Sequence, residues 1–194
     1  MNGEAVIDVK GLTKKFSGRT VVDHFDLKVP KGAIYGFLGP NGSGKTTTIR
    51  MACGLLKADA GAGTVLGFDV IRESDRIKER VGYMTQRFSL YGDLSIRENL
   101  EFIARLYSLD DLSDRVEASL KSLGLSDRAR QLAGTLSGGW KQRLALAACM
   151  IHEPDLLLLD EPTAGVDPKA RRDFWDAIRD YAAEGVTTLV STHY

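Results

Sequence analysis

The sequence of 194 residues lacks several features that mark particular classes of protein. No apolar stretch approaches the ~18 residues that suggest a membrane-spanning helix, so we expect the chain to have no membrane span of its own. An excess of one charge is also lacking, because 26 Lys and Arg residues balance 26 Asp and Glu residues. Neither sign forms blocks. This balance does not favour the electrostatic attraction that is typical of nucleic-acid-binding proteins, and we expect no nucleic-acid partner.

Cysteine is scarce, and the N-terminus lacks the layout of a targeting signal. The two cysteines, Cys53 and Cys149, lie in helical patterns without the spacing of a metal site. We expect each to be a small core residue in a reducing, cytoplasmic compartment. The first ten residues do not have the basic and then apolar order of a signal peptide. Because no internal repeat or low-complexity linker is visible, the length suits one domain, or one domain with a small subdomain.

Hydrophobic patterning predicts several short strands. The expected strands cover residues 5–9, 21–29, 34–38, 65–70, 81–84, 156–159 and 186–192. The apolar run 156–159 also fits a helical fragment. Its short length and the flanking prolines favour a strand that is buried on both faces of a parallel sheet.

Helical spacing separates these strands. Helices are expected after Gly44, twice between Ser95 and Gly134, from Gly138 and from Pro168. In the middle region, Ser95 with Glu98 and Asp114 with Glu117 have the spacing of capping boxes. The sequence therefore predicts an α/β domain that is interrupted by a helical insert.

The run GPNGSGKTTT, residues 39–48, fits the pattern GxxxxGK[ST] between an expected strand and an expected helix. Glycines let backbone N–H groups turn inward around phosphate oxygens, and a helix N-terminus adds the positive end of its dipole. Lys45 would reach the β- and γ-phosphates, and the Thr46 hydroxyl would bind Mg²⁺. The alternative is a glycine-rich turn with a purely structural use.

The run LLLLDEP, residues 156–162, places two carboxylates at the C-terminal end of a buried strand. Ligands of open α/β sheets bind at this end of the strands. Asp160 would hold Mg²⁺, directly or through water, and Glu161 would be the general base that orients the attacking water. An acidic pair at a strand end is also common as plain surface.

The run LSGGW, residues 136–140, puts a serine and two glycines at the start of an expected helix. These residues fit an N-cap with a flexible approach. They also fit a second anion site, made by the Ser137 hydroxyl and the N–H groups of Gly138 and Gly139. Two phosphate-binding helix starts in one fold suggest that one nucleotide meets both, the second from another chain.

These motifs, in this order, resemble the ATP-binding domain of ABC transporters over nearly the whole chain. In that family GPNGSGKT is the Walker A loop, LSGG the signature and LLLLDE the Walker B strand. The resemblance also makes Ala164 to Asp167 the D-loop, Gln86 the Q-loop glutamine and His193 the switch histidine, and it puts Phe16 where an aromatic ring stacks on adenine. Taken singly, Phe16 also fits a core aromatic, Gln86 a solvated strand end and His193 a surface histidine.

The resemblance implies ATP and Mg²⁺ as cofactors, with three groups of site residues. Expected catalytic residues are Lys45, Gln86, Glu161 and His193. Expected metal ligands are Thr46, Gln86 and Asp160. Expected nucleotide-binding residues are Phe16, Gly39, Pro40, Asn41, Gly42, Ser43, Gly44, Lys45, Thr46, Thr47, Ser137, Gly138 and Gly139.

The fold implied is an α/β P-loop NTPase with a mixed, mainly parallel core sheet, N-terminal antiparallel strands and an inserted helical subdomain. Residues 1–88 and 136–194 would form a RecA-like core, and residues 89–135, approximately, the helical subdomain. Two departures stand out. Trp140 replaces the glutamine that most often follows LSGG, and it would pack on the insert or contact nucleotide. The family's domain usually continues beyond the switch histidine, so its C-terminal part is expected to be missing here.

The function implied is that of an ATP-hydrolysing subunit that dimerises head-to-tail around ATP and powers export. Its expected partners are a second ATP-binding domain, in a homodimer or heterodimer, and a separate transmembrane permease, on the cytoplasmic side of the membrane. Residues 83–100 resemble drug and polysaccharide exporters. The alternatives are a soluble ABC ATPase that acts on the ribosome or on nucleic acid, and an ordinary P-loop kinase or GTPase.

Overall fold

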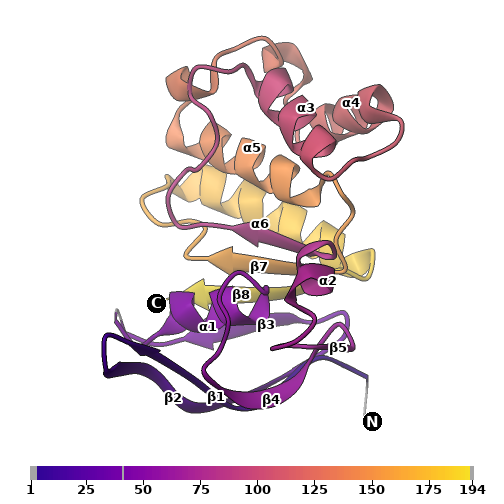
Figure 1. The fold of residues 1–194 in the computed structure, drawn as a ribbon. Coiled ribbons are helices and arrows are strands. Elements are labelled where there is room, and N and C mark those ends of the chain that lie inside the picture. The colour runs from indigo at the N-terminus through magenta and orange to yellow at the C-terminus, as the bar shows by residue number, and fades with distance from the viewer. Residues whose placement is uncertain (1–3, 41, 193–194) are drawn as a thin grey trace.

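The computed structural model describes residues 4–40 and 42–192, which form two sheets and their covering helices (Figure 1). One sheet is antiparallel and the other is parallel, so the predicted α/β fold class is confirmed. The antiparallel sheet has the order β2 (Arg19–Pro30), β1 (Ala5–Phe16), β4 (Ala60–Val65) and β5 (Phe68–Asp69). The parallel sheet has the order β3 (Ile34–Leu38), β8 (Thr187–Thr192), β7 (Leu156–Asp160) and β6 (Val81–Met84).

The helices form layers on and between the sheets (Figure 1). Helix α1 contacts strands of both sheets, and α5 and α6 cover the other face of the parallel sheet. Helices α3 and α4 pack together beyond α5. The helices are α1 (Lys45–Ala52), α2 (Ser74–Lys78), α3 (Ile96–Leu106), α4 (Leu112–Ser122), α5 (Gly138–Met150) and α6 (Pro168–Ala183), with 3-10 turns η1 (Ser126–Arg128) and η2 (Ala133–Thr135). Within residues 4–40 and 42–192, no helix is both long and apolar enough to span a bilayer.

Strand β7 is buried along its whole length, as its run of leucines predicts. Leu156 and Leu158 pack in the core on the α1 side, whereas Leu157 and Leu159 pack in the core on the α5 and α6 side. Side chains of a strand alternate between its two faces, so a strand covered by helices on both faces needs apolar residues at every position. The strand thus carries the next residue, Asp160, to the edge of the sheet in a buried environment.

Only one of the two predicted capping boxes forms. At the start of α3, the Glu98 N–H donates to the Ser95 hydroxyl over 3.2 Å, and the Ser95 N–H donates to the Glu98 carboxylate over 2.8 Å. The prediction for Asp114 and Glu117 is wrong. Helix α4 begins one turn earlier, because the Asp114 N–H already donates to the Asp111 carbonyl over 3.0 Å.

Two predicted strands have different bounds in the structure, because turns lie at other residues than expected. The strand expected at 65–70 is the end of a hairpin, in which Leu66 (φ 54°) and Gly67 (φ 80°) form the loop between β4 and β5. The strand expected to end at residue 9 runs on to Phe16, where Ser17 (φ 48°) and Gly18 (φ 80°) turn the chain into β2. Two successive residues with positive φ match the twist of a two-residue hairpin. The short helix α2 and both 3-10 turns were not predicted.

Candidate functional site

The glycine loop joins β3 to α1 through backbone that only glycine adopts easily. Gly42 and Gly44 have φ values of +82° and +86°, in the left-handed region that most side chains avoid. A Cβ on Gly44 would also lie 2.8 Å from the Val21 carbonyl oxygen. The loop can therefore follow this path only with glycine at position 44. Asn41, which was expected to bind nucleotide, lies outside the described residues.

The Lys45 side chain is buried inside the loop that precedes it. Its ammonium donates to the carbonyl oxygens of Gly39, over 2.5 Å, and Pro40, over 2.9 Å. The same Nζ lies 3.8 Å from a carboxylate oxygen of Glu161. The loop thus wraps around a fixed positive charge that faces the acidic end of β7.

The start of α1 opens on a cavity of about 340 Å³. The first N–H groups of a helix have no partner within the helix, and they carry the positive end of its dipole. No side chain caps α1, because its N-cap is Gly44. This geometry suits an anion such as a phosphate. The cavity is lined by Val21, Gly42, Gly44, Lys45, Thr46, Thr47, Gln86 and Glu161.

The acidic pair at the end of β7 is fixed by the neighbouring strand β8. Asp160 is only 3% exposed, and it accepts a hydrogen bond of 2.7 Å from the Ser191 hydroxyl. The Glu161 N–H donates to the Ser191 hydroxyl and carbonyl oxygens over 3.1 and 3.2 Å. Ser191 was missed in the sequence. The sequence could have indicated its role, because Ser191 is a polar residue near the C-terminal end of a predicted strand.

Glu161 itself has a strained backbone and a held side chain. Its φ of +48° is unusual for a residue with a side chain, and such conformations cost on the order of 1 to 3 kcal/mol. Its carboxylate accepts a hydrogen bond of 2.9 Å from the amide nitrogen of Gln86, which follows β6. Three of the residues expected to be catalytic, Lys45, Gln86 and Glu161, therefore line one cavity. The fourth, His193, lies outside the described residues.

Phe16 and the predicted signature residues at the start of α5 do not line this cavity. Phe16 ends β1 with 45% of its surface exposed, and the Lys14 ammonium lies 5.6 Å from the centre of its ring. Ser137 occupies the N-cap position of α5, but its exposed hydroxyl makes no capping hydrogen bond. Of residues 137–139 and Phe16, none lines the cavity at Lys45. The start of α5, like that of α1, thus has no side-chain cap.

Trp140 packs on the helical segment between β6 and α5, one of its two expected positions. The guanidinium of Arg128, in η1, lies 4.5 Å from the centre of the indole ring, and that of Arg143 lies 4.9 Å from it. Arg143 also donates to Asp173 of α6 over 2.8 Å. Cation–π contacts of this kind stabilise by roughly 0.5 to 2 kcal/mol. Trp140 thus joins the start of α5 to η1, and Arg143 joins the same helix to α6.

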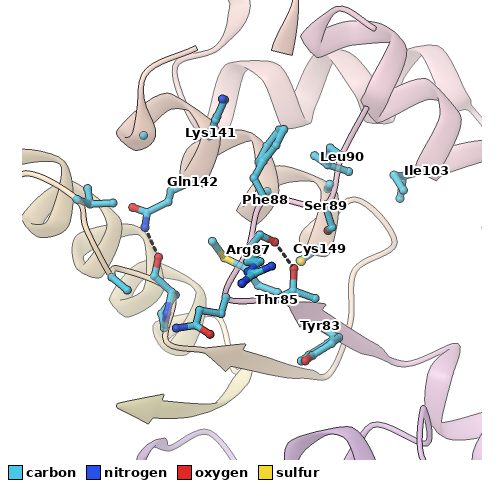
Figure 2. A pocket seen from close by; sticks show the side chains of 18 of the residues that line it. Tyr83, Thr85, Arg87, Phe88, Ser89, Leu90, Ile103, Lys141, Gln142 and Cys149 are labelled. Carbon is cyan, nitrogen blue, oxygen red and sulfur yellow. Dashed lines mark hydrogen bonds between the residues drawn. The ribbon is translucent and has the colours of Figure 1, made fainter. Parts of the chain in front are cut away.

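A second hollow, of about 330 Å³, lies between α5, the end of α3 and the segment that follows β6 (Figure 2). Figure 2 shows Lys141, Gln142 and Cys149 along α5, opposite Phe88 and the rest of the segment from Thr85 to Leu90. This segment begins one residue before Gln86, so the hollow and the cavity at Lys45 share that residue.

Cys149 and His152, which line this hollow, have pKa values that burial shifts strongly. Burial raises the pKa of the Cys149 thiol to about 12. Burial also lowers the pKa of His152 from 6.5 to about 4. The His152 ring stacks on Tyr107, with 3.9 Å between ring centres, and its Nε2 donates to the Val81 carbonyl over 3.2 Å. Both groups are therefore neutral at pH 7.

Comparison with known proteins identifies the family. A protein-family model described as "ABC transporter" matches residues 22–164, well over half of the chain. This chain belongs to the ABC transporter family. The matched region contains the glycine loop, Gln86, the start of α5 and the acidic pair. Proteins of this family bind ATP.

Among ABC transporter proteins, the relatives include drug-resistance components. The chain is 45% identical over 194 residues to the Escherichia coli protein named "Probable multidrug ABC transporter ATP-binding protein YbhF", covering 99% of this chain and 34% of that protein. It is 43% identical to the daunorubicin/doxorubicin resistance ATP-binding protein DrrA of Streptomyces peucetius, covering 97% of this chain and 58% of that protein. The chain therefore spans between about a third and three fifths of the length of these two relatives.

Solved ABC transporter structures share the fold. CbiO1 of Clostridium perfringens, part of the transporter complex CbiONQ, matches with a TM-score of 0.87 and 27% identity, over 98% of this chain and 79% of that chain. The ATP-binding cassette MJ1267, in its ADP conformation, matches with a TM-score of 0.85 and 26% identity, over 98% and 82% of the two chains.

Proposed function

We propose that this chain binds ATP with Mg²⁺ in the cavity at Lys45, hydrolyses it, and powers export through a separate membrane protein. One observation carries the proposal: Lys45, Gln86 and Glu161 meet at a cavity where the N-terminus of α1 opens. A buried cation, an uncapped helix start and a carboxylate are the groups that hydrolysis of a nucleoside triphosphate requires.

The glycine loop and α1 bind the phosphates in this proposal. Gly39, Pro40, Asn41, Gly42, Ser43 and Gly44 supply the backbone around them, and Thr46 and Thr47 the first helical turn. Lys45 exchanges its bonds to the Gly39 and Pro40 carbonyls for phosphate oxygens, because a charged acceptor makes a stronger hydrogen bond than a neutral one. Phe16 lies at a strand end with an exposed ring that can stack on the base.

The residues proposed as Mg²⁺ ligands offer the oxygen donors that this ion prefers. Thr46 and Gln86 line the cavity, and Asp160 is a buried carboxylate at the carboxyl edge of the sheet. Bound there, Mg²⁺ would neutralise charge on the β- and γ-phosphates. The Ser191 hydroxyl keeps Asp160 in one orientation.

Glu161 orients and polarises the attacking water as the general base. Its carboxylate already faces the cavity, held by Gln86 and close to Lys45. His193, which follows Thr192 in the sequence, is proposed to keep the γ-phosphate and this water in register.

A second ATP-binding domain completes the site in this proposal. Ser137, Gly138 and Gly139 make an exposed helix start that does not line the chain's own cavity. In a head-to-tail dimer it would bind the γ-phosphate of ATP held by the other subunit. Either two identical copies or two different domains satisfy this geometry. Residues 1–88 and 136–194 then form the ATP-binding core, and residues 89–135, approximately, the inserted subdomain.

The hollow in Figure 2 is the proposed docking site of the permease on the cytoplasmic side of the membrane. It contains Gln86, so a segment bound there can sense the cavity at Lys45. Export of drugs is proposed by analogy with the named relatives. Recovery of the chain in washed membranes supports this role, and recovery with ribosomes would support the alternative of a soluble ABC ATPase.

The central test is ATP hydrolysis by the purified chain with Mg²⁺. We expect phosphate release that is lost in Lys45→Ala, because the fixed cation of the loop is removed. Lys57→Ala is the matched control, since Lys57 is exposed just after α1, and it should hydrolyse ATP like the parent. Equal hydrolysis by the Lys45→Ala variant would refute the proposed site.

A further inference from the structure

The backbone at Glu161 needs support from both sides. Its φ of +48° lies in a region that a residue with a side chain leaves when it is free to do so. Such a conformation persists only where the surrounding structure determines it. On the N-terminal side, Ser191 accepts two hydrogen bonds from the Glu161 N–H. This holds the peptide that enters Glu161.

On the C-terminal side, the Glu161 carbonyl accepts a hydrogen bond of 3.2 Å from the Ala164 N–H, and a further support comes from Gln142. Its amide nitrogen donates a hydrogen bond to the carbonyl oxygen of Pro162, the residue directly after Glu161, and the bond is the dashed line drawn from Gln142 in Figure 2. Pro162 is buried, so its carbonyl oxygen has little access to water and needs a donor from the protein. Gln142 reaches it from the first turns of α5.

We infer that Gln142 is a positioning residue for Glu161: its hydrogen bond to Pro162 holds the general base in the strained conformation that aims its carboxylate at the cavity. The inference rests on the proposed function, in which Glu161 activates water. Gln142 does not line the cavity at Lys45, so its effect passes through the backbone. Loss of the bond should therefore change turnover and leave ATP binding as it was.

The test uses the purified chain and three variants. Gln142→Met keeps the length of the side chain and removes the donor, whereas Gln142→Lys restores a donor at the same position. Gln131→Met is the matched control, because the Gln131 side chain forms hydrogen bonds with Arg128 and Thr135, away from Glu161. We measure kcat and KM for ATP hydrolysis, ATP affinity by calorimetry, and melting temperature.

We expect Gln142→Met to lower kcat by about 10- to 100-fold, as misplacement of a catalytic group does, with KM and ATP affinity unchanged. Gln142→Lys should recover most of the lost kcat, and Gln131→Met should match the parent. A role in packing alone would make Met the milder change and Lys the more harmful one, because Met is apolar and of similar length. That order, or parental kcat in Gln142→Met, would overturn the inference.

A parallel measurement on Glu161→Gln separates this inference from the proposed function. If Glu161→Gln is inactive while Gln142→Met has parental kcat, Glu161 is the base and the positioning role is wrong. If Glu161→Gln hydrolyses ATP at the parental rate, Glu161 is not the base, and the inference fails with that assignment. If the parent chain itself does not hydrolyse ATP, the proposed function fails.

Discussion

Gln86 and Glu161 are joined by a hydrogen bond of 2.9 Å although 75 positions separate them in the sequence. The register of the parallel sheet explains the pairing. Met84 at the end of β6 lies opposite Leu159 of β7, and the same offset, continued two residues beyond the strand, brings Gln86 to Glu161. The bond joins Gln86, a proposed Mg²⁺ ligand, to the proposed base.

Replacing the carboxylate of Glu161 should separate ATP binding from hydrolysis. Glu161→Gln keeps the size and hydrogen-bonding capacity of the side chain, but it removes the group that accepts a proton. Because general-base catalysis contributes about 10²- to 10⁴-fold in rate, we expect turnover to fall by that factor while ATP still binds and promotes dimers. Single-turnover hydrolysis and size-exclusion chromatography with ATP measure the two effects. Unchanged turnover would exclude Glu161 as the base.

Hydrolysis should depend on protein concentration more steeply than linearly. The cavity at Lys45 lacks residues 137–139, which are proposed to come from a second subunit. In other enzymes, one missing donor to transition-state charge costs about 2.7 to 4 kcal/mol, so a monomer should be nearly inactive. A dilution series of initial rates measures the order of the reaction. Activity that stays strictly proportional to protein at high dilution would argue against the shared site.

Alanine at Gly44 should be more harmful than alanine at Gly42. Both glycines have positive φ, so each substitution costs on the order of 1 to 2 kcal/mol of backbone strain. At Gly44 the new Cβ would also lie 2.8 Å from the Val21 carbonyl oxygen, whereas at Gly42 no atom lies within 4 Å. We expect a larger loss of unfolding free energy and of ATP affinity for Gly44→Ala. Urea unfolding and calorimetry provide both values, and equal losses would contradict the expected clash with Val21.

Stability should fall on acidification because of His152. Its pKa is near 4 in the folded protein and 6.5 ordinarily, so below pH 6.5 the unfolded chain binds a proton that the folded one does not. Neutral, buried His152 therefore contributes fully to the free energy of unfolding above pH 6.5. As the pH falls toward 4, this contribution is lost, which lowers the free energy of unfolding by on the order of 3 kcal/mol. His152→Phe keeps a ring against Tyr107 and cannot titrate. Its unfolding free energy should vary less between pH 7 and pH 5 than that of the parent, and an identical slope would remove His152 as the cause.

The sequence by itself determined the features that depend on neighbouring residues. The spacing of Gly39, Gly44, Lys45 and Thr46 predicted a glycine loop before a helix, and the leucines of β7 predicted a strand covered on both faces. The box at Ser95 could also be read from the chain, because its partners are three residues apart. Local periodicity and capping need no knowledge of the rest of the molecule.

Prediction from local sequence patterns failed where a few residues fitted two different structures. The pair Asp114 and Glu117 has the spacing of a capping box, yet the backbone of α4 begins from the carbonyl of Asp111. The turn at Leu66 and Gly67 was not predicted, because apolar residues on both sides of it fit one continuous strand. Asn41 and His193 stay predictions, since both lie outside the described residues.

Only the tertiary structure decided which distant groups meet. The β6–β7 register brings Gln86 to Glu161, Ser191 of the adjacent strand holds Asp160, and Gln142 of α5 reaches Pro162. The tertiary structure also places Ser137 away from the cavity at Lys45, although Ser137 and Lys45 each lie at the start of a helix in a phosphate-binding pattern. These pairings follow from strand register and helix packing, which are set by the burial of the whole core and leave no mark in the spacing of any one motif.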